Sequence, residues 1–222
     1  MDRVTDAFGW PSRDPEWLTK LLIIALTLLI PIVGAINGIG WMLASLDRLR
    51  AGDERLAPAN LRYIGRGFGL FVVNLVYELA VGLVAAVIYV PAVVVASGQN
   101  NGPANPGLVS LAILLSLLAF SVATLGSLAL TFAMPSIVLA TDGGGIRGGL
   151  HVGVVLRQVR ANVASTLIAG LMLIAAGFVG SLGVVACGIG VLFTTAYSLA
   201  MQAWIVRSFE VGSADLPAQG GT

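Results

Sequence analysis

Long apolar stretches alternate with short charged ones along the chain. Four stretches are apolar, at residues 21–45, 68–96, 108–140 and 163–206, and the first and last contain no charged residue. Charged residues gather instead at 1–20, 47–66 and 141–162. Apolar runs of about 18 residues or more are typical of membrane-spanning helices. The pattern therefore predicts an all-α integral membrane protein.

The length of the last stretch predicts a helical hairpin. As a single helix its 44 residues would be roughly 66 Å long, against a hydrocarbon core of about 30 Å. Tilting of the helix cannot absorb that excess. Glycines cluster near the middle, and we expect the turn at Cys187-Gly188-Ile189-Gly190. The segment would then form two spans, at 163–184 and 190–208.

The first stretch allows two arrangements. Residues 17–45 would be roughly 44 Å long as one helix, and Pro31 and Gly34 lie near its middle. It forms either one kinked span or a re-entrant hairpin of two short helices whose turn is shielded by protein. Charge favours the hairpin. If all three regions fold back, the far-side turns around Pro31, at 97–106 and at 187–190 carry no charge, and all 12 Lys and Arg fall on the other face.

We therefore predict one helical membrane domain over residues 1–222, built from three helical hairpins with about six membrane segments. The predicted parts are a cytoplasmic N-terminal segment (1–16), a first hairpin or kinked span (17–49), a second hairpin (67–140), a third hairpin (163–208) and a polar tail (209–222). Because Lys and Arg accumulate on the cytoplasmic side of membranes, both termini are predicted to be cytoplasmic, in a cell (inner) membrane.

Composition excludes several other classes of protein. Hydrophobic residues make up 57% of the chain and charged residues 10%, against about 45–50% and 25% in soluble domains. The net charge of +1 gives no basis for nucleic-acid binding. A single cysteine and a single histidine leave no internal disulfide and make a zinc site improbable. No metal or cofactor is predicted, and the lipid bilayer is the expected partner.

Several short segments resemble a known family. The stretch from Asp14 to Ile23 (DPEWLTKLLI), the following LIPIVG at 29–34, the RAGDE at 50–54 and the CGIG at 187–190 are similar to a prokaryotic membrane family known as domain of unknown function 4013. The resemblance spans most of the chain. It implies an integral membrane protein and supplies no activity, cofactor or catalytic residue.

One acidic residue lies inside a predicted span and marks the candidate intramembrane polar site. Glu78 falls about ten residues into its helix, and an ionisable group at that depth should face a partner or a cavity. Polar residues share its helix face or line faces of two other helices, so that three polar seams could converge. The candidate site comprises Glu78, Asn74, Tyr77, Ser121, Thr124, Thr195 and Gln202, with Ser116, Ser127, Thr131 and Ser198 on the same faces. The seams predict either a proton or cation path or hydrogen bonds between helices, and we favour the second.

Other residues are predicted to act at the membrane surface. The arginine pairs Arg62/Arg66 and Arg157/Arg160 lie at one-face helical spacing and are candidate contacts for anionic lipid headgroups, although setting the topology is the simpler role. Trp10, Trp17, Trp41 and Trp204 are expected as interface anchors. The glycine-rich stretch 143–149 is expected to be a flexible connector, and residues 147–162 could lie flat on the membrane.

These features support two functional hypotheses. The first is a non-enzymatic helical membrane module that assembles with itself or with a membrane protein partner. The alternative is a small channel or a proton- or cation-coupled carrier that uses Glu78 and the Ser/Thr-lined helix faces. An enzyme is not predicted, because the spans hold no paired aspartates, metal triad or nucleophile–base pair.

Overall fold

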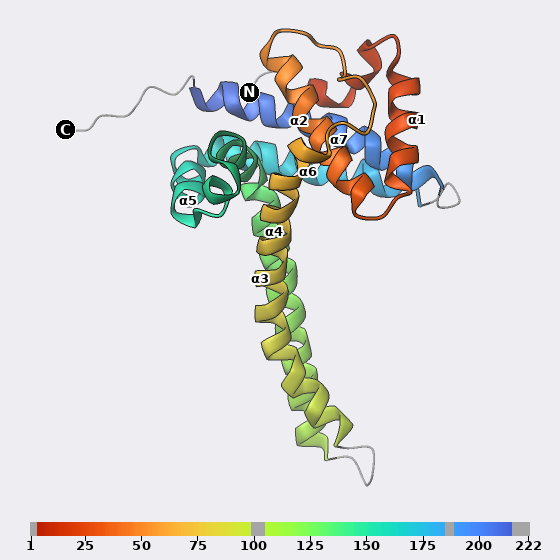
Figure 1. The fold of residues 1–222 in the computed structure, drawn as a ribbon. Coiled ribbons are helices and arrows are strands. Elements are labelled where there is room, and N and C mark those ends of the chain that lie inside the picture. The colour runs from red at the N-terminus through yellow and green to blue at the C-terminus, as the bar shows by residue number, and fades with distance from the viewer. Residues whose placement is uncertain (1–3, 99–104, 185–188, 215–222) are drawn as a thin grey trace, which may run out of the picture. The chain divides into compact units, whose positions relative to one another are not determined.

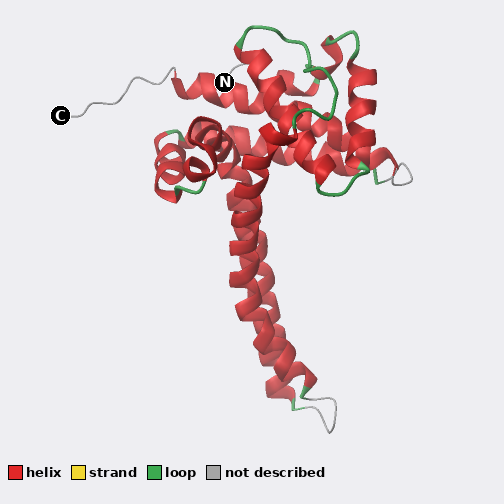
Figure 2. Ribbon diagram, in the orientation of Figure 1, coloured by secondary structure: helices red, strands yellow, loops and turns green. Residues whose placement is uncertain are grey.

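The computed structural model describes residues 4–98, 105–184 and 189–214, and these fold entirely as helices and loops (Figures 1 and 2). The helices are η1 (Val4–Phe8), η2 (Pro11–Arg13), α1 (Trp17–Leu28), α2 (Val33–Arg50), α3 (Ile64–Ser97), α4 (Pro106–Gly149), α5 (Val152–Ala161), α6 (Val163–Leu182) and α7 (Ile189–Ala214). The predicted all-α class is confirmed. Among the described residues α3, α4 and α6 are long and apolar enough to cross a membrane, and the count of six segments stays a prediction. Cys187 and Gly188 of the predicted turn lie outside the described residues.

Two compact units make up the chain, and each is described by itself. Unit 1 comprises Met1–Val73 and Thr131–Thr222, and unit 2 comprises Asn74–Leu130. In unit 1, α7 packs against α1, α2, α6 and η1. Small residues of α7, Ala196, Ala200 and Ala203, are fully buried, because short side chains let neighbouring helices approach closely. Helix α7 is thus the centre of the unit 1 core.

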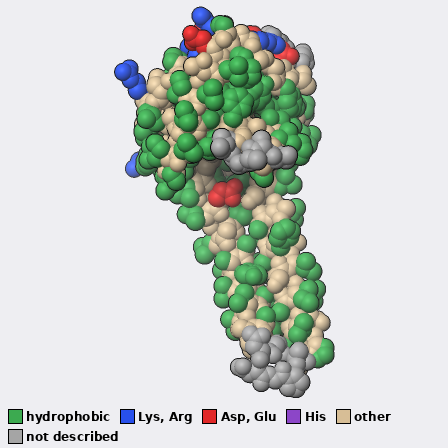
Figure 3. Space-filling view, turned by 90° about the vertical axis from the view of Figure 1, so that its right-hand side faces the viewer, with side chains coloured by type: hydrophobic (Ala, Val, Ile, Leu, Met, Phe, Trp, Pro, Cys, Tyr) green, Lys and Arg blue, Asp and Glu red, His purple; other side chains and the backbone are tan. Residues whose placement is uncertain are grey.

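Unit 2 holds the C-terminal part of α3 and the N-terminal part of α4, which lie side by side and expose mostly apolar side chains (Figures 1 and 3). Of the 18 consecutive residues that are most apolar in α3, 11% are buried, and the same fraction is buried in α4. The only charged residue of unit 2 is Glu78. A surface this apolar is compatible with lipid as its solvent.

The first apolar stretch folds as two helices, α1 and α2, that pack against each other. The break between them contains Pro31, and Ile32 adopts a positive φ of 63°, a conformation that β-branched residues rarely adopt. Gly34 is required just after it, since a Cβ there would lie 2.1 Å from the carbonyl oxygen of Thr27. The segment 17–49 is therefore a helical pair, and its insertion into the membrane stays a prediction.

Three of the four tryptophans are core residues of unit 1, so their expected role as interface anchors is wrong. Trp10 and Trp41 have no exposed surface, and Trp204 is 7% exposed. The Trp10 and Trp204 rings lie 5.6 Å apart, centroid to centroid. The indole of Trp41 donates a hydrogen bond to the carbonyl of Ala57 at 2.9 Å. A buried indole N–H needs such an acceptor, and the loop after α2 supplies it. Trp17 is half-buried.

The glycine-rich stretch expected as a flexible connector belongs to α4 instead. Helix α4 continues to Gly149 and is interrupted at Gly145, where φ is 62° and ψ is −160°. A Cβ at Gly148 would lie 2.4 Å from the carbonyl oxygen of Ala140. Gly148 is needed because the chain turns back closely on the preceding helix, where only a residue without a Cβ fits.

A close crossing of α2 and α3 gives the first testable prediction. A Cβ at Gly67 would lie 1.9 Å from the carbonyl oxygen of Ile36, whereas a Cβ at Gly65 would meet no atom within 4 Å. Gly67→Ala is expected to lower the free energy of unfolding by about 1–3 kcal/mol because α2 and α3 must move apart. Gly65→Ala is the matched control, with little effect. Unfolding in detergent followed by tryptophan fluorescence measures both, and equal stabilities would contradict the close crossing.

Candidate functional site

The intramembrane polar site is centred on a contact between α3 and α4 in unit 2. Ser127 donates a hydrogen bond from its Oγ to Glu78 Oε2 at 3.3 Å. Glu78 is exposed, and Asn74 and Tyr77 on the same helix are half-buried. A Cβ at Gly126 would lie 2.6 Å from the Val81 side chain, so the two helices pack tightly beside this pair. The structure thus joins two of the seams predicted from the sequence, those of α3 and α4.

Two other predicted hydroxyls of α4 bond within their own helix. Ser116 donates to the carbonyl of Ala112, and Ser121 to that of Leu117, each at 2.8 Å. Thr124 is exposed. Hydroxyls that bond to the preceding turn need no partner from another helix. These side chains can therefore face lipid without a polar path along the helix.

The third predicted seam, on α7, belongs to unit 1. Gln202 donates its Nε2 to Ser198 Oγ at 3.5 Å, a long contact. Ser198 is 5% exposed, whereas Thr195 and Gln202 are half-buried. Convergence of this seam with Glu78 remains a prediction.

Sequence reasoning missed a network of charges that joins four helices of unit 1. Asp142 on α4 accepts a hydrogen bond from Arg50 on α2 at 2.6 Å and pairs with Arg66 on α3 at 2.8 Å. Arg50 also pairs with Glu210 on α7 at 3.1 Å, and Asp47 accepts from Arg66 at 2.9 Å. Burial disfavours the charge on Arg50, but hydrogen bonds to Glu210 and Asp142 outweigh it and raise the pKa of that guanidinium.

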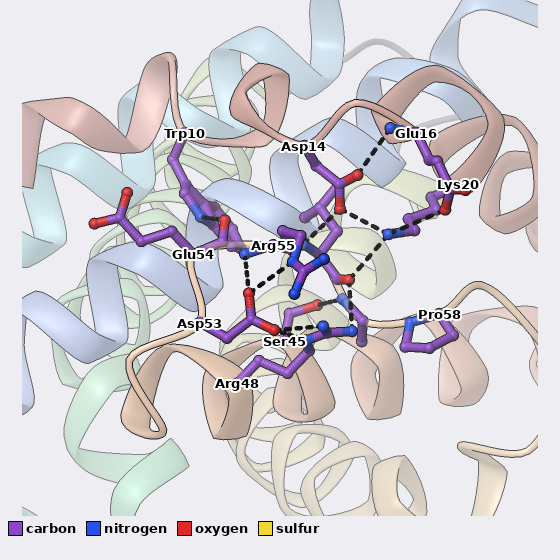
Figure 4. Close-up of polar contacts among 12 residues, drawn as sticks. Trp10, Asp14, Glu16, Lys20, Ser45, Arg48, Asp53, Glu54, Arg55 and Pro58 are labelled. Atoms are coloured by element: carbon purple, nitrogen blue, oxygen red, sulfur yellow. Dashed lines mark hydrogen bonds and ion pairs between the residues drawn. The ribbon is translucent and has the colours of Figure 1, made fainter.

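A buried carboxylate ties the N-terminal segment to the loop after α2 (Figure 4). The Asp14 side chain is 1% exposed. It accepts hydrogen bonds from Lys20 Nζ at 2.7 Å, from the Glu16 N–H at 2.8 Å and from the Leu56 N–H at 2.9 Å. Burial alone would raise the pKa of Asp14, but the Lys20 hydrogen bond and the backbone donors lower it overall. The carboxylate therefore stays ionised and joins residues that are 42 positions apart in the chain.

A second carboxylate, Asp53, holds the same loop against α2 (Figure 4). The N-terminal segment 4–20 and the loop 51–63, which Asp14 and Asp53 hold in place, are together called the cap. Arg48 and Arg55 both pair with Asp53, and the hydrogen bond from Arg48 is the largest cause that lowers the pKa of Asp53 far below its usual value. Ser45 Oγ accepts from the Ala57 N–H at 3.2 Å. The contacts of the cap hold the loop after α2 against that helix and against the N-terminal segment. Its signal in the sequence was the Asp-Pro-Glu-Trp segment with a lysine six residues after the aspartate.

The four arginines predicted to contact lipid differ in their surroundings. Arg66 is engaged by Asp47 and Asp142. Arg62 is exposed, and its backbone N–H donates to Asn60 Oδ1 at 2.9 Å. Arg157 and Arg160 are exposed on α5 and form no ion pair with any residue that the structure describes. The α5 pair therefore keeps its charge available for an external anion.

A comparison with protein families gives one match. A family model described as Protein of unknown function (DUF4013) matches residues 23–189. No curated protein and no solved structure matches the chain. The match covers the second half of α1 and all of α2 to α6, including the Glu78–Ser127 contact and every residue of the charge network except Glu210.

Proposed function

Because the chain belongs to the DUF4013 family of proteins of unknown function, we propose from its own residues that it is a non-enzymatic helical membrane module that assembles with a second copy of itself. The contact surface is the Glu78 face of α3 and α4 in unit 2. The membrane is the inner membrane of the cell, with both termini in the cytoplasm, since residues 74–130 contain no Lys or Arg.

The exposure of Glu78 carries the proposal. An ionisable side chain that faces lipid costs roughly 2.5–3.5 kcal/mol on insertion scales, and Ser127 at 3.3 Å supplies a single hydrogen bond. No cation of the unit 2 sequence can neutralise it. A polar partner from another helix removes this cost, because polar side chains drive helix association in lipid.

A second copy is the partner whose chemistry fits. Asn74 lies four residues before Glu78 and shares its helix face. An amide donor and a carboxyl acceptor on one face can pair reciprocally across a two-fold axis, as isologous dimers do. The face thus carries both halves of the contact that it needs.

The carrier hypothesis is second, because two of the hydroxyls expected to line its path bond within their own helix. Ser116 and Ser121 donate to carbonyls of their own helix. What favours a carrier is the contact of the Glu78 carboxyl with a hydroxyl, an arrangement through which protons can pass.

Dimerisation in liposomes tests the proposal. Protein labelled with donor or acceptor dye at Cys187, the single cysteine, should show energy transfer that rises with protein density. Glu78→Leu is expected to weaken association about tenfold, and Glu78→Gln, which keeps hydrogen-bonding capacity, by much less. Leu83→Ala, an exposed position on the same helix, serves as the control.

Two outcomes would count against self-assembly. The first is monomers at every protein density, and the second is a Glu78→Leu variant that associates like the wild type. A pH-dependent flux through the same liposomes, abolished by Glu78→Gln, would instead support the carrier.

A further inference from the structure

We infer that unit 1 carries a binding site for an anionic phospholipid, in a groove between the end of α4 and the start of α5. The phosphate lies at Arg147 and His151, and an acyl chain follows the groove wall. This inference is independent of the proposed dimerisation, which uses unit 2.

The groove has the chemistry of an amphiphile site. It has a volume of about 470 Å³, within the range of small-molecule sites. Leu139, Ala140 and Val154 form its apolar wall, and Arg147 and His151 line it as well. Both of these basic residues are exposed. An apolar trough beside a cation matches a lipid tail joined to an anionic headgroup.

The cations at this site lack acidic partners. Residues 143–209 contain no Asp or Glu. Arg147, Arg157 and Arg160 form no ion pair with a described residue, whereas salt bridges occupy Arg13, Lys20, Arg48, Arg50, Arg55, Arg66 and Arg207. Without these three arginines the chain has 9 basic and 11 acidic residues, a net charge of −2. The segment is thus a local excess of positive charge on a chain that is otherwise slightly acidic.

Helix α5 carries Arg157 and Arg160 beside exposed apolar side chains. Val152 is 58% exposed and Leu156 is 42% exposed, while Val155 on the neighbouring flank is 5% exposed and anchors the helix to unit 1. At 100° per residue, Arg160 lies next to Val152 and Leu156 on the helix. A helix with this arrangement lies in the plane of an interface, with its apolar side in the acyl region and its arginines at the headgroups. It therefore places the groove at headgroup depth.

Native mass spectrometry of the full chain tests the assignment. Purified protein in detergent is incubated with equal amounts of phosphatidylglycerol and phosphatidylcholine that have the same acyl chains. Phosphatidylglycerol should be retained about fivefold or more in preference. The double variant Arg147→Gln/His151→Gln should lose this preference, whereas Arg55→Gln, which removes an exposed charge from the cap, should keep it.

A pair of glycine variants tests the groove without changing charge. A Cβ at Gly144, which lines the groove, or at Gly153, which does not, meets no atom within 4 Å. Gly144→Leu should fill the groove and reduce the retained phosphatidylglycerol severalfold, and Gly153→Leu should retain it like the wild type.

Three results would overturn the proposal. They are equal retention of the two lipids by the wild type, an unchanged preference in the double variant, and equal retention by the two leucine variants. A soluble glycerol phosphate that displaces the lipid at equal concentration would identify the ligand as a free phosphate ester instead. Variants are compared only where their unfolding temperatures in detergent match, and Gly144→Leu keeps the test valid if the double variant is unstable.

Discussion

Asp14→Asn is expected to destabilise unit 1 by about 3–5 kcal/mol, the cost of leaving a buried charge without its partner. Asparagine has nearly the same shape and can still accept from one backbone N–H. It leaves the Lys20 ammonium, whose side chain is 13% exposed, with only the solvent-exposed Glu16 carboxylate at 3.6 Å as a counter-charge. Urea unfolding in detergent followed by tryptophan fluorescence measures the loss, because Trp10 lies in the same cap and donates to the Glu54 carbonyl at 2.6 Å.

The control for this prediction is another aspartate of the same segment. Asp6→Asn removes a pair with Arg13 in which both side chains are about a third exposed or more, so the loss should be about 0–1 kcal/mol. The double variant Asp14→Asn/Lys20→Met should recover part of the loss, because it removes the stranded charge. Equal losses in Asp14→Asn and Asp6→Asn would show that Asp14 is not the anchor of the cap.

The Asp14 contact also has a defined pH dependence. Its pKa in the folded protein is lower than in the unfolded chain, so the unfolded chain takes up the proton first as the pH falls. The contribution is therefore complete above the unfolded value of about 4 and decreases as the pH falls through it toward the folded value. The wild type should lose stability in this window, and Asp14→Asn should lack that component.

Asp142→Asn is expected to cost about 2–4 kcal/mol, because Asp142 is the shared counter-charge of Arg50 and Arg66. Its side chain is 10% exposed. Without it Arg50 keeps Glu210 and Asp47, but the ion pairs that tie α4 to α2 and α3 are lost. The same unfolding experiment in detergent measures this loss.

Asp47→Asn is a closely matched control, since Asp47 pairs with the same two arginines. Its side chain is 47% exposed, and solvent-exposed pairs contribute about 0–1 kcal/mol. A loss at Asp47 as large as that at Asp142 would contradict the argument from burial.

The sequence alone predicted the part of the candidate site that stands out within a single helix. Glu78 and the Ser127 face stand out because a charge and a hydroxyl seam are conspicuous within apolar helices, and the structure places these two residues in contact. The burial of Asp14 and its contact with the loop after α2 could not be predicted in the same way. Its partner Leu56 lies 42 residues away, and an apolar residue that contributes only backbone hydrogen bonds leaves no trace in the sequence.

The tryptophans show the same limit. Their side chains suit either a membrane interface or a core with one hydrogen-bond acceptor. For Trp41 the acceptor is the carbonyl of Ala57 in the loop after α2. The path of that loop, and therefore the burial of Trp41, depends on the carboxylates of Asp14 and Asp53 that hold it.

By itself the sequence determined the all-helical class and the apolar character of the long helices, because span length and the cost of burying backbone polar groups in lipid depend only on local composition. It also located Glu78, the one acidic residue within the predicted apolar spans. Only the tertiary structure decided which charges neutralise one another, which tryptophans are buried and which arginines remain free. Those outcomes depend on the distances between segments far apart in the chain, and electrostatic and packing energies follow distance in space rather than separation in sequence.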